Sequence, residues 1–317
     1  MTTEPATADD DDLIWHYTNA EGLYGIIGHE KQKNLVMHCT NVLFLNDSKE
    51  YYLTLEIVKN GLKEKYCDKP MGLRRNSISR MIKKLEELNT ELKEFFSPFI
   101  ASFCEEGDKL SQWRGYCLGG GYSLGFSKSS LQEIENDGKL QLNSVSYLTE
   151  IDSPPNFLDF FDDFINSFET LVPDWDYDPV SIPRGGLMSF TNLPKNKSVE
   201  ELNDERTQVW VMELTLSTAF YNGILELIPF YKHLSFQEEN EWRVIYTDIS
   251  DPKFKHTNNI LKPYKELEIP KAALKKIIIG PTNNAELCEL GINMFLKDQD
   301  LEYVEVKRSE IPYRTHY

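Results

Sequence analysis

The stretch Gln237-Glu238-Glu239-Asn240-Glu241-Trp242-Arg243-Val244-Ile245-Tyr246 leads a run of carboxylates into an apolar segment. Residues 241–246 predict a β-strand, because aromatic and β-branched residues gather there. Side chains alternate between the faces of a strand, so Glu239 and Glu241 point the same way if the strand begins at this entrance. Such a carboxylate pair is either solvated surface charge, with one member paired to Arg243, or part of a functional site.

Strands are predicted towards both ends of the chain, with helices between them. Few regular strand–helix–strand units occur, which favours an α+β fold with a mixed or antiparallel central sheet and flanking helices. We expect residues 1–12 to be a disordered acidic lead-in and residues 13–317 to form one α+β domain with a mainly helical insertion around 150–232. The expected strands are 13–17, 35–38, 42–45, 99–104, 122–126, 140–148, 241–246, 266–269, 276–279 and 303–306, and the expected helices are 20–27, 48–65, 76–96, 156–171, most of 198–232, and 284–297.

The bulk composition excludes several classes of protein. The formal net charge is -17, from 34 Lys+Arg and 51 Asp+Glu, so the chain as a whole repels nucleic-acid phosphate. No apolar run approaches the roughly 20 residues that a membrane helix needs, and the polar N-terminus does not resemble a secretory signal. An odd number of cysteines without a CxxC pair favours a reducing cytoplasm, and the histidines lack metal-ligand spacing.

Two polar groups follow apolar segments in the first part of the chain. His16 and Tyr17 lie at the end of the first expected strand, where an imidazole can donate to a sugar hydroxyl and an aromatic ring can stack on a base. Asn46, Asp47 and Glu50 follow the segment 42–45. They either cap the next helix, with an acidic first turn, or form the polar lip of a pocket.

A third group combines a strand end with two aromatic rings. Ser102 lies in the buried segment 99–104, and Trp113, Arg114 and Tyr116 follow a polar loop. A helical turn would put Trp113 and Tyr116 on one face. The glycines that follow at 119–121 let a backbone approach a ligand closely. The alternative is a surface loop packed by its own aromatic residues.

Taken in order, these groups resemble a widespread bacterial family that is catalogued as domain of unknown function 2971. The resemblance spans roughly residues 13 to 282, and Cys104 stands where a serine is more usual. The matching residues are His16-Tyr17-Thr18, Leu45-Asn46-Asp47 with Glu50, Ser102-Phe103, Trp113 with Tyr116, Gly121-Tyr122-Ser123-Leu124-Gly125-Phe126, Glu239-Asn240-Glu241-Trp242-Arg243 and Ile278-Ile279-Gly280-Pro281.

A more distant resemblance is to the ADP-ribosyltransferases, which place a histidine on the first strand, an aromatic residue centrally and a Glu-x-Glu late in the chain. It implies an ADP-ribosyltransferase-like fold and NAD as substrate. His16 would then hold the ribose, Trp113 or Tyr116 would stack on nicotinamide, Glu241 would be catalytic and Glu239 would position the acceptor. Arg114 or Arg243 could pair with the NAD pyrophosphate.

The resemblance implies a bacterial toxin or a phage-defence effector that acts in the cytoplasm on a protein or small-molecule acceptor. Two alternatives remain open at this point. One is a divalent-metal hydrolase or nuclease with Asp47, Glu50, Glu239 and Glu241 as ligands. The other is a non-catalytic module that binds a nucleotide or a protein. The sequence does not give the oligomeric state.

Overall fold

The computed structural model describes residues 12–28, 33–45, 98–117, 119–134, 140–149, 228–246, 248, 250–257 and 259–312, together with 56, 57, 59–61, 63, 64 and 83. The chain divides into two compact units, and most of the described residues belong to the first. That unit consists of Met1–Ser48, Ser97–Tyr147 and Pro229–Tyr317, and the second of Lys49–Phe96 and Leu148–Ile228. The expectation of one domain with an insertion around 150–232 stays a prediction.

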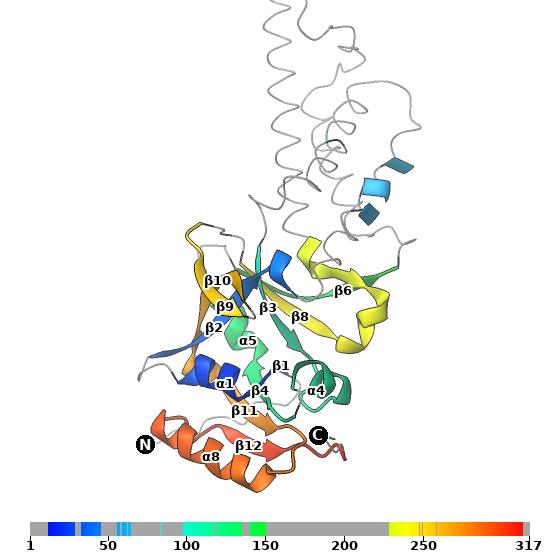
Figure 1. The fold of residues 1–317 in the computed structure, drawn as a ribbon. Coiled ribbons are helices and arrows are strands. Elements are labelled where there is room, and N and C mark those ends of the chain that lie inside the picture. The colour runs from blue at the N-terminus through cyan, green and yellow to red at the C-terminus, as the bar shows by residue number, and fades with distance from the viewer. Residues whose placement is uncertain are drawn as a thin grey trace, which may run out of the picture. The chain divides into compact units, whose positions relative to one another are not determined.

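The described residues form an α+β arrangement with one large sheet (Figure 1). The α-helices are α1 (Ala20–Ile27), α4 (Leu110–Tyr116), α5 (Lys128–Gln132) and α8 (Ala285–Asp298), and the 3₁₀ turns are η2 (Val42–Phe44), η5 (Ile228–Phe230), η6 (Leu234–Glu239) and η7 (Lys271–Ala273). The strands are β1 (Leu13–Thr18), β2 (Asn34–Asn41), β3 (Phe99–Cys104), β4 (Tyr122–Ser127), β5 (Leu140–Ser144), β6 (Ser146–Leu148), β7 (Tyr231–His233), β8 (Glu241–Tyr246), β9 (Lys253–Thr257), β10 (Ile260–Pro270), β11 (Leu274–Ile279) and β12 (Glu305–Arg308).

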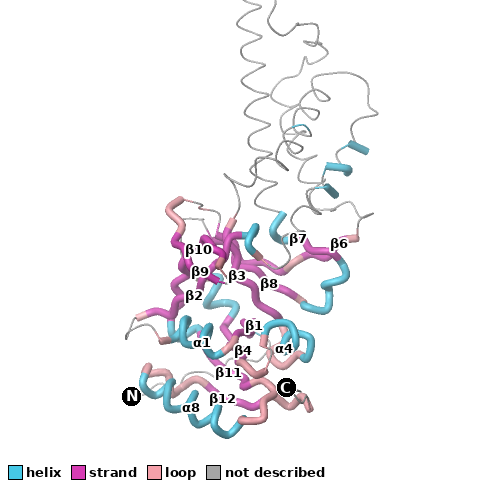
Figure 2. The backbone as a smooth tube through the Cα atoms, viewed as in Figure 1, coloured by secondary structure: helices cyan, strands magenta, loops and turns pink. Residues whose placement is uncertain are grey.

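The large sheet has ten strands in the order β12-β11-β4-β1-β3-β2-β10-β9, and β8 joins both β3 and β5 (Figure 2). Among the described strands of this sheet, only β11 and β12 pair in parallel, with α8 as the connection between them. The other pairs are antiparallel. The predicted mixed or antiparallel central sheet is therefore confirmed, as a mixed sheet that is largely antiparallel. Among the described residues, no helix has both the length and the apolar character that crossing a bilayer requires.

The sheet divides at strand β3, and this division positions the candidate site. One edge of β3 pairs with β8 over its whole length. The other edge is shared: Cys104 pairs with Trp15 of β1, whereas Phe99 and Ile100 pair with Asn41 and Thr40 of β2. Within the described residues, the part of this edge around Ser102 has no strand partner, and β1 and β2 diverge on either side of it.

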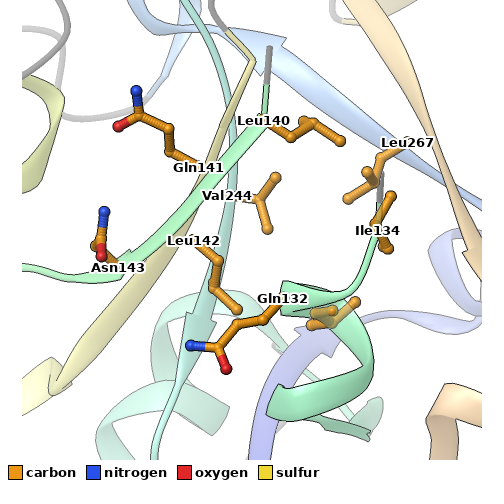
Figure 3. Close-up of a pocket in the computed structure, with 9 residues that line it drawn as sticks. Gln132, Ile134, Leu140, Gln141, Leu142, Asn143, Val244 and Leu267 are labelled. Atoms are coloured by element: carbon orange, nitrogen blue, oxygen red, sulfur yellow. The ribbon is translucent and has the colours of Figure 1, made fainter. Parts of the chain in front are cut away.

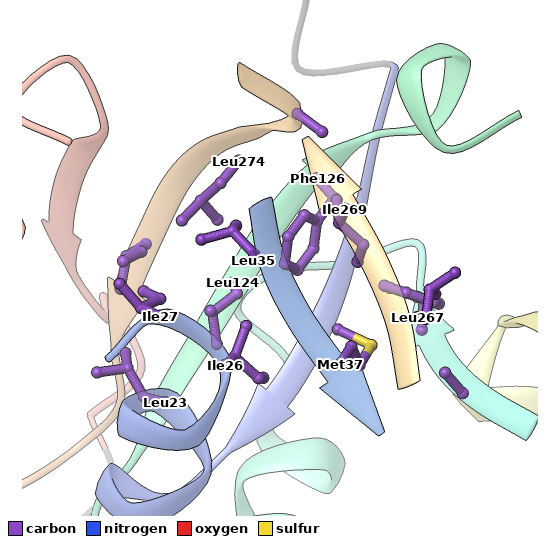
Figure 4. Packing of buried hydrophobic residues seen from close by; sticks show 14 of the residues in the cluster. Leu23, Ile26, Ile27, Leu35, Met37, Leu124, Phe126, Leu267, Ile269 and Leu274 are labelled. Carbon is purple, nitrogen blue, oxygen red and sulfur yellow. The ribbon is translucent and has the colours of Figure 1, made fainter. Parts of the chain in front are cut away.

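The main hydrophobic core lies on one side of this divided sheet. Helix α1 brings Leu23, Ile26 and Ile27 against side chains from β2, β4 and β10 (Figure 4). The helix begins at Asn19, whose side chain accepts a hydrogen bond from the backbone N–H of Gly22 at 2.8 Å. Burying a large aliphatic side chain contributes about 1.5–3 kcal/mol, so this cluster supplies much of the stability of the unit.

A smaller core covers the opposite face of β1. It contains Trp15 and Tyr17 of β1, Cys104 of β3 and Trp113 of α4. A β-carbon at Gly280 would lie 2.8 Å from the indole of Trp113, so this position requires a glycine. Alternation along β1 sends Ile14 to the main core and its two neighbours to this smaller one.

Two local predictions were wrong and one strand was missed, each for an identifiable reason. Residues 42–44 form a 3₁₀ turn rather than a strand, because the Asn41 side chain accepts from the backbone N–H of Leu43 at 3.1 Å. Residues 231–233 form strand β7 rather than the end of a helical region. Strand β9 was not predicted, because its sequence, Lys-Phe-Lys-His-Thr, lacks a buried apolar face.

Candidate functional site around Ser102

His16 projects from β1 into the region where the sheet divides. Its Nδ1 lies 2.9 Å from the backbone carbonyl oxygen of Ser102, and its ring meets Phe103 edge-on at 5.9 Å. Burial lowers the pKa of His16, the hydrogen bond to Ser102 opposes this, and the charge of Lys255 lowers the pKa further. His16 is therefore a neutral imidazole at physiological pH, and Nδ1–H is the tautomer that can donate to the carbonyl oxygen.

Glu241 begins β8 and lies at the centre of a buried ionic cluster. Its carboxylate accepts from Arg243 Nε at 2.7 Å and from Arg243 Nη2 at 2.9 Å. The ammonium of Lys232 lies 3.2 Å from the same carboxylate and 2.8 Å from that of Glu239. We call these four residues the Glu241 cluster: Lys232, Glu239, Glu241 and Arg243. It contains two cations and two carboxylates, so its formal charge is balanced.

The chain around Glu241 fixes its orientation. Asn240 adopts the left-handed conformation, with φ 42°, and ends η6 just before the strand begins. The backbone N–H of Glu241 donates to the hydroxyl of Tyr147 at 2.8 Å, and Arg243 Nη1 donates to the carbonyl of Pro229 at 2.5 Å. Glu239 lies in η6 rather than in the strand, so the two carboxylates meet through Lys232.

The Glu241 carboxylate is held in its ionised form. Burial alone would raise its pKa, but the charge and hydrogen bonds of Arg243 oppose this, helped by Lys232 and by a side-chain hydrogen bond with Ser102. The net effect is a lowered pKa. Such a group is suited to stabilising positive charge rather than to donating a proton.

Ser102 connects the two halves of the candidate site. Its backbone carbonyl contacts His16, and its side chain supports Glu241. Strand pairing places Ser102 opposite Arg243 on one face of the sheet, whereas His16 pairs with Leu124, whose side chain enters the main core. The His16 and Glu241 side chains thus leave opposite faces of the sheet, and Ser102 is the residue that contacts both.

The predicted aromatic residues have different surroundings. Trp113 is only 2% exposed, its ring packs edge-on against Tyr17 at 4.7 Å, and its Nε1–H donates to Asp108 at 2.7 Å. Its faces are covered by protein, which corrects the expectation that it stacks on a ligand. Tyr17 is also buried, and its hydroxyl donates to the Glu106 carbonyl at 2.7 Å. Tyr116 is 46% exposed and stays a candidate for stacking.

The predicted cationic and acidic residues also have different surroundings, and some of them lie outside the described residues. Arg243 is 6% exposed, and its guanidinium donates to Glu241 and to the Pro229 carbonyl. It therefore does not fit the expected role of binding a pyrophosphate. Arg114 is exposed on α4. Asn46, Asp47 and Glu50 lie outside the described residues. Within the described part of the chain no three His, Cys, Asp or Glu side chains form a metal-binding group, and the four-carboxylate alternative stays a prediction.

Lys232 and Tyr147 belong to the site but were not singled out from the sequence. Lys232 lies in β7, which was assigned to a helical region, and Tyr147 lies in β6. Recognising a short strand at 231–233 would have placed Lys232 on a strand that directly precedes the turn leading to the Glu-x-Glu segment. The partner residues of Glu241 were therefore hidden by an incorrect secondary-structure assignment.

A cavity of about 340 Å³ lies on the other face of β8 from Glu241 (Figure 3). Leu140 and Leu142 of β5 point into it with Val244 of β8, whereas Gln141 and Asn143 point away. Val244 belongs to the main core, so this cavity opens beside that core. It is not lined by His16, Ser102 or Glu241 and is separate from the candidate site.

Residues 112–244 match the model of a family described as a protein of unknown function (DUF2971). This match includes Trp113, Tyr116 and the Glu-x-Glu-Trp-Arg segment, and it supports the resemblance to that family. No match to the chain was found among curated proteins or solved structures. The family description names no activity, so the chemistry has to be argued from the residues themselves.

Proposed function

We propose that the protein is an ADP-ribosyltransferase-like enzyme that cleaves the bond between nicotinamide and ribose in NAD. The observation that supports this most is the position of Ser102, which contacts His16 through its backbone and Glu241 through its side chain. A neutral imidazole and an ionised carboxylate thereby lie on the two sides of strand β3. These are the two groups that the resemblance assigns to ribose binding and to catalysis.

The reaction would use these groups as follows. The bond between the ribose C1′ and the nicotinamide nitrogen breaks, its electron pair leaves with nicotinamide, and the ribose acquires oxocarbenium character. Glu241 stabilises that positive charge, more strongly in the transition state than in the ground state. The nucleophile then adds to C1′ while Glu239 accepts its proton. His16 holds the ribose.

The ligand would have to lie across the edge of β3, because His16 and Glu241 leave opposite faces of the sheet. Glu241 also has to release a donor. Arg243 Nε, Arg243 Nη2, Lys232 and Ser102 already occupy its acceptor positions, of which a carboxylate has about four. Lys232 makes the longest of the measured contacts, at 3.2 Å, so a ribose hydroxyl would most easily replace it. The acceptor is proposed to be a protein or small molecule, as in a toxin or phage-defence effector.

The proposal is tested by supplying the purified protein with NAD labelled in its nicotinamide or its adenine, together with cell lysate. Wild-type protein should release labelled nicotinamide and transfer the adenine label to an acceptor. Glu241→Gln should lose both activities. Glu266→Gln is the matched control, since Glu266 of β10 pairs with the exposed Lys253 of β9. No detectable binding of NAD at millimolar concentration would exclude the proposal.

A second candidate is a non-catalytic module that binds a nucleotide, and the saturated environment of Glu241 favours it. A carboxylate with its acceptor positions filled by protein donors is well suited to holding β7 and β8 together. This reading predicts nucleotide binding that survives Glu241→Gln, without turnover in either form. Equal NAD affinity in wild type and Glu241→Gln, with no nicotinamide release from either, would favour the binding module over the enzyme.

A further inference from the structure

Two lysines face each other across the β9–β10 hairpin. Lys255 pairs directly with Lys262 in the strand register, and both side chains are partly buried. Neither forms an ion pair with any carboxylate that the structure describes. This is unusual in a chain with 51 acidic and 34 basic residues, where counter-charges are abundant.

Neighbouring groups hold the two ammonium groups in place. Lys262 Nζ donates to the backbone carbonyl of Phe44 at 3.3 Å, and Lys255 Nζ lies 5.6 Å from the ring centroid of Tyr264. The Tyr264 ring in turn packs against His38, at 4.0 Å between centroids. By contrast, Lys253 on the same strand is exposed and pairs with Glu266 at 2.6 Å.

Like charges directly opposite each other in a sheet destabilise it. The effect is visible at Lys255, whose pKa is lowered by burial and then by the charge of Lys262. The Phe44 carbonyl and the Tyr264 ring stabilise the ammonium groups, but no carboxylate among the described residues balances their charge. A bound anion would balance it.

The lysine pair lies on the same face of the sheet as the Glu241 cluster. Tyr264 pairs with Thr40, Thr40 with Ile100, and Ser102 with Arg243, so alternation carries one face from the hairpin across β2 and β3 to β8. The hairpin also affects His16, because the charge of Lys255 contributes to the lowered pKa of that residue. The lysines therefore lie on the same face as the Glu241 cluster, with β2 between their hairpin and β3.

We propose that Lys255 and Lys262 form the subsite for the diphosphate group of NAD. The identity of this ligand rests on the proposed function, whereas the capacity to bind a diphosphate follows from the lysine pair itself. Two ammonium groups can each donate to different phosphate oxygens. The subsite supplies the cations that Arg243 cannot, because Arg243 is committed to Glu241.

The test is a titration of the full-length protein with inorganic pyrophosphate and, separately, with NAD, followed by calorimetry and by thermal unfolding. Wild-type protein should bind pyrophosphate and unfold at a higher temperature in its presence. Lys255→Gln and Lys262→Gln should each weaken pyrophosphate binding by about tenfold or more, since hydrogen bonds to charged groups contribute about 1.5–3 kcal/mol. Lys253→Gln, the matched control, should bind as wild type does.

The variants also separate a subsite from a purely structural role. Without pyrophosphate, Lys255→Gln should unfold at the same temperature as wild type or higher, because the repulsion is relieved. The subsite is refuted if wild type does not bind pyrophosphate at millimolar concentration, or if Lys253→Gln weakens binding as much as the other two. Pyrophosphate binding that depends on the pair, without NAD cleavage, would retain the subsite and reject the proposed function. NAD cleavage with unchanged NAD affinity in both variants would retain the proposed function and reject the subsite.

Discussion

The Glu241 cluster and the lysine pair of the β9–β10 hairpin lie on the same face of one sheet, yet they handle charge in opposite ways. In the Glu241 cluster, Lys232 and Arg243 balance Glu239 and Glu241. In the hairpin, Lys255 and Lys262 face each other with no carboxylate among the described residues to balance them. The first arrangement stabilises the fold as it stands. In the second, the proposed diphosphate ligand would balance the charge of the lysines.

The difference predicts opposite signs for charge removal at the two places. The largest effect is expected for Arg243→Leu, which leaves Glu241 buried with Lys232 as its remaining cation. Breaking a buried ion pair from one side costs about 3–5 kcal/mol, so the free energy of unfolding in urea should fall by that amount. Arg308→Leu is the control, because its pair with Glu289 is exposed and is worth about 1 kcal/mol at most. Similar small losses in both variants would mean that the buried cluster does not stabilise the unit.

Lys232→Met tests the Glu241 cluster by two measurements, the free energy of unfolding and the release of nicotinamide. The change removes a hydrogen-bonded charge from Glu241 and should lower the free energy of unfolding by about 1–3 kcal/mol. Under the proposed function it also frees an acceptor position on the carboxylate, so nicotinamide release from NAD should rise. Lys276→Met, which removes a buried lysine paired with Glu305, should leave that release unchanged. A folded Lys232→Met protein with reduced release would show that Lys232 assists the reaction instead.

The pH dependence of stability should reveal the ionised state of Glu241. Its pKa in the folded protein is lowered, so its contribution to stability is fully present above its ordinary pKa. That contribution is lost as the pH falls through the folded value. The stability difference between wild type and Glu241→Gln should therefore shrink in urea titrations taken from about pH 6 towards about pH 3. A difference that stays constant over this range would mean that the carboxylate gains nothing from its cations.

The smallest effect, with the opposite sign, is expected at the hairpin. Lys255→Gln removes a charge from the unbalanced pair and should raise the free energy of unfolding by about 0.2–1 kcal/mol. Urea unfolding in a phosphate-free buffer measures this, and Lys253→Gln should show no gain because its ion pair with Glu266 is lost. A loss of stability in Lys255→Gln would indicate that the contact with the Tyr264 ring outweighs the repulsion.

Local sequence patterns were sufficient to locate most of the described strands. Segments such as 99–104 and 241–246 have strong β-formers and match β3 and β8 in full. The pattern failed at 42–44, where the Asn41 side chain competes with strand pairing, and at β9, where lysines occupy an edge strand. Helices expected at 48–65, 76–96 and 156–171 fall largely or wholly outside the described residues.

The site was harder to derive than the strands. Glu241 and Arg243 could be chosen from sequence, because a Glu-x-Glu-Trp-Arg run before an apolar segment is chemically conspicuous. Their link to His16 could not be predicted from sequence, since it depends on β1 and β8 pairing with opposite edges of β3. The burial of Trp113 also depends on distant residues, namely Tyr17 and Gly280. Such contacts come from topology, which residue spacing does not encode.

The central claim is that His16 and Glu241 serve one NAD molecule from the two sides of β3, and the most direct test is the rate of nicotinamide release. Glu241→Gln removes transition-state stabilisation and should reduce the rate by about 10²–10³-fold. His16→Phe keeps a ring against Phe103 but cannot hydrogen-bond ribose, and it should reduce the rate about tenfold or more. With both variants folded by circular dichroism, the account predicts both losses and a normal rate for Glu266→Gln. Wild-type rates in His16→Phe and Glu241→Gln would contradict it.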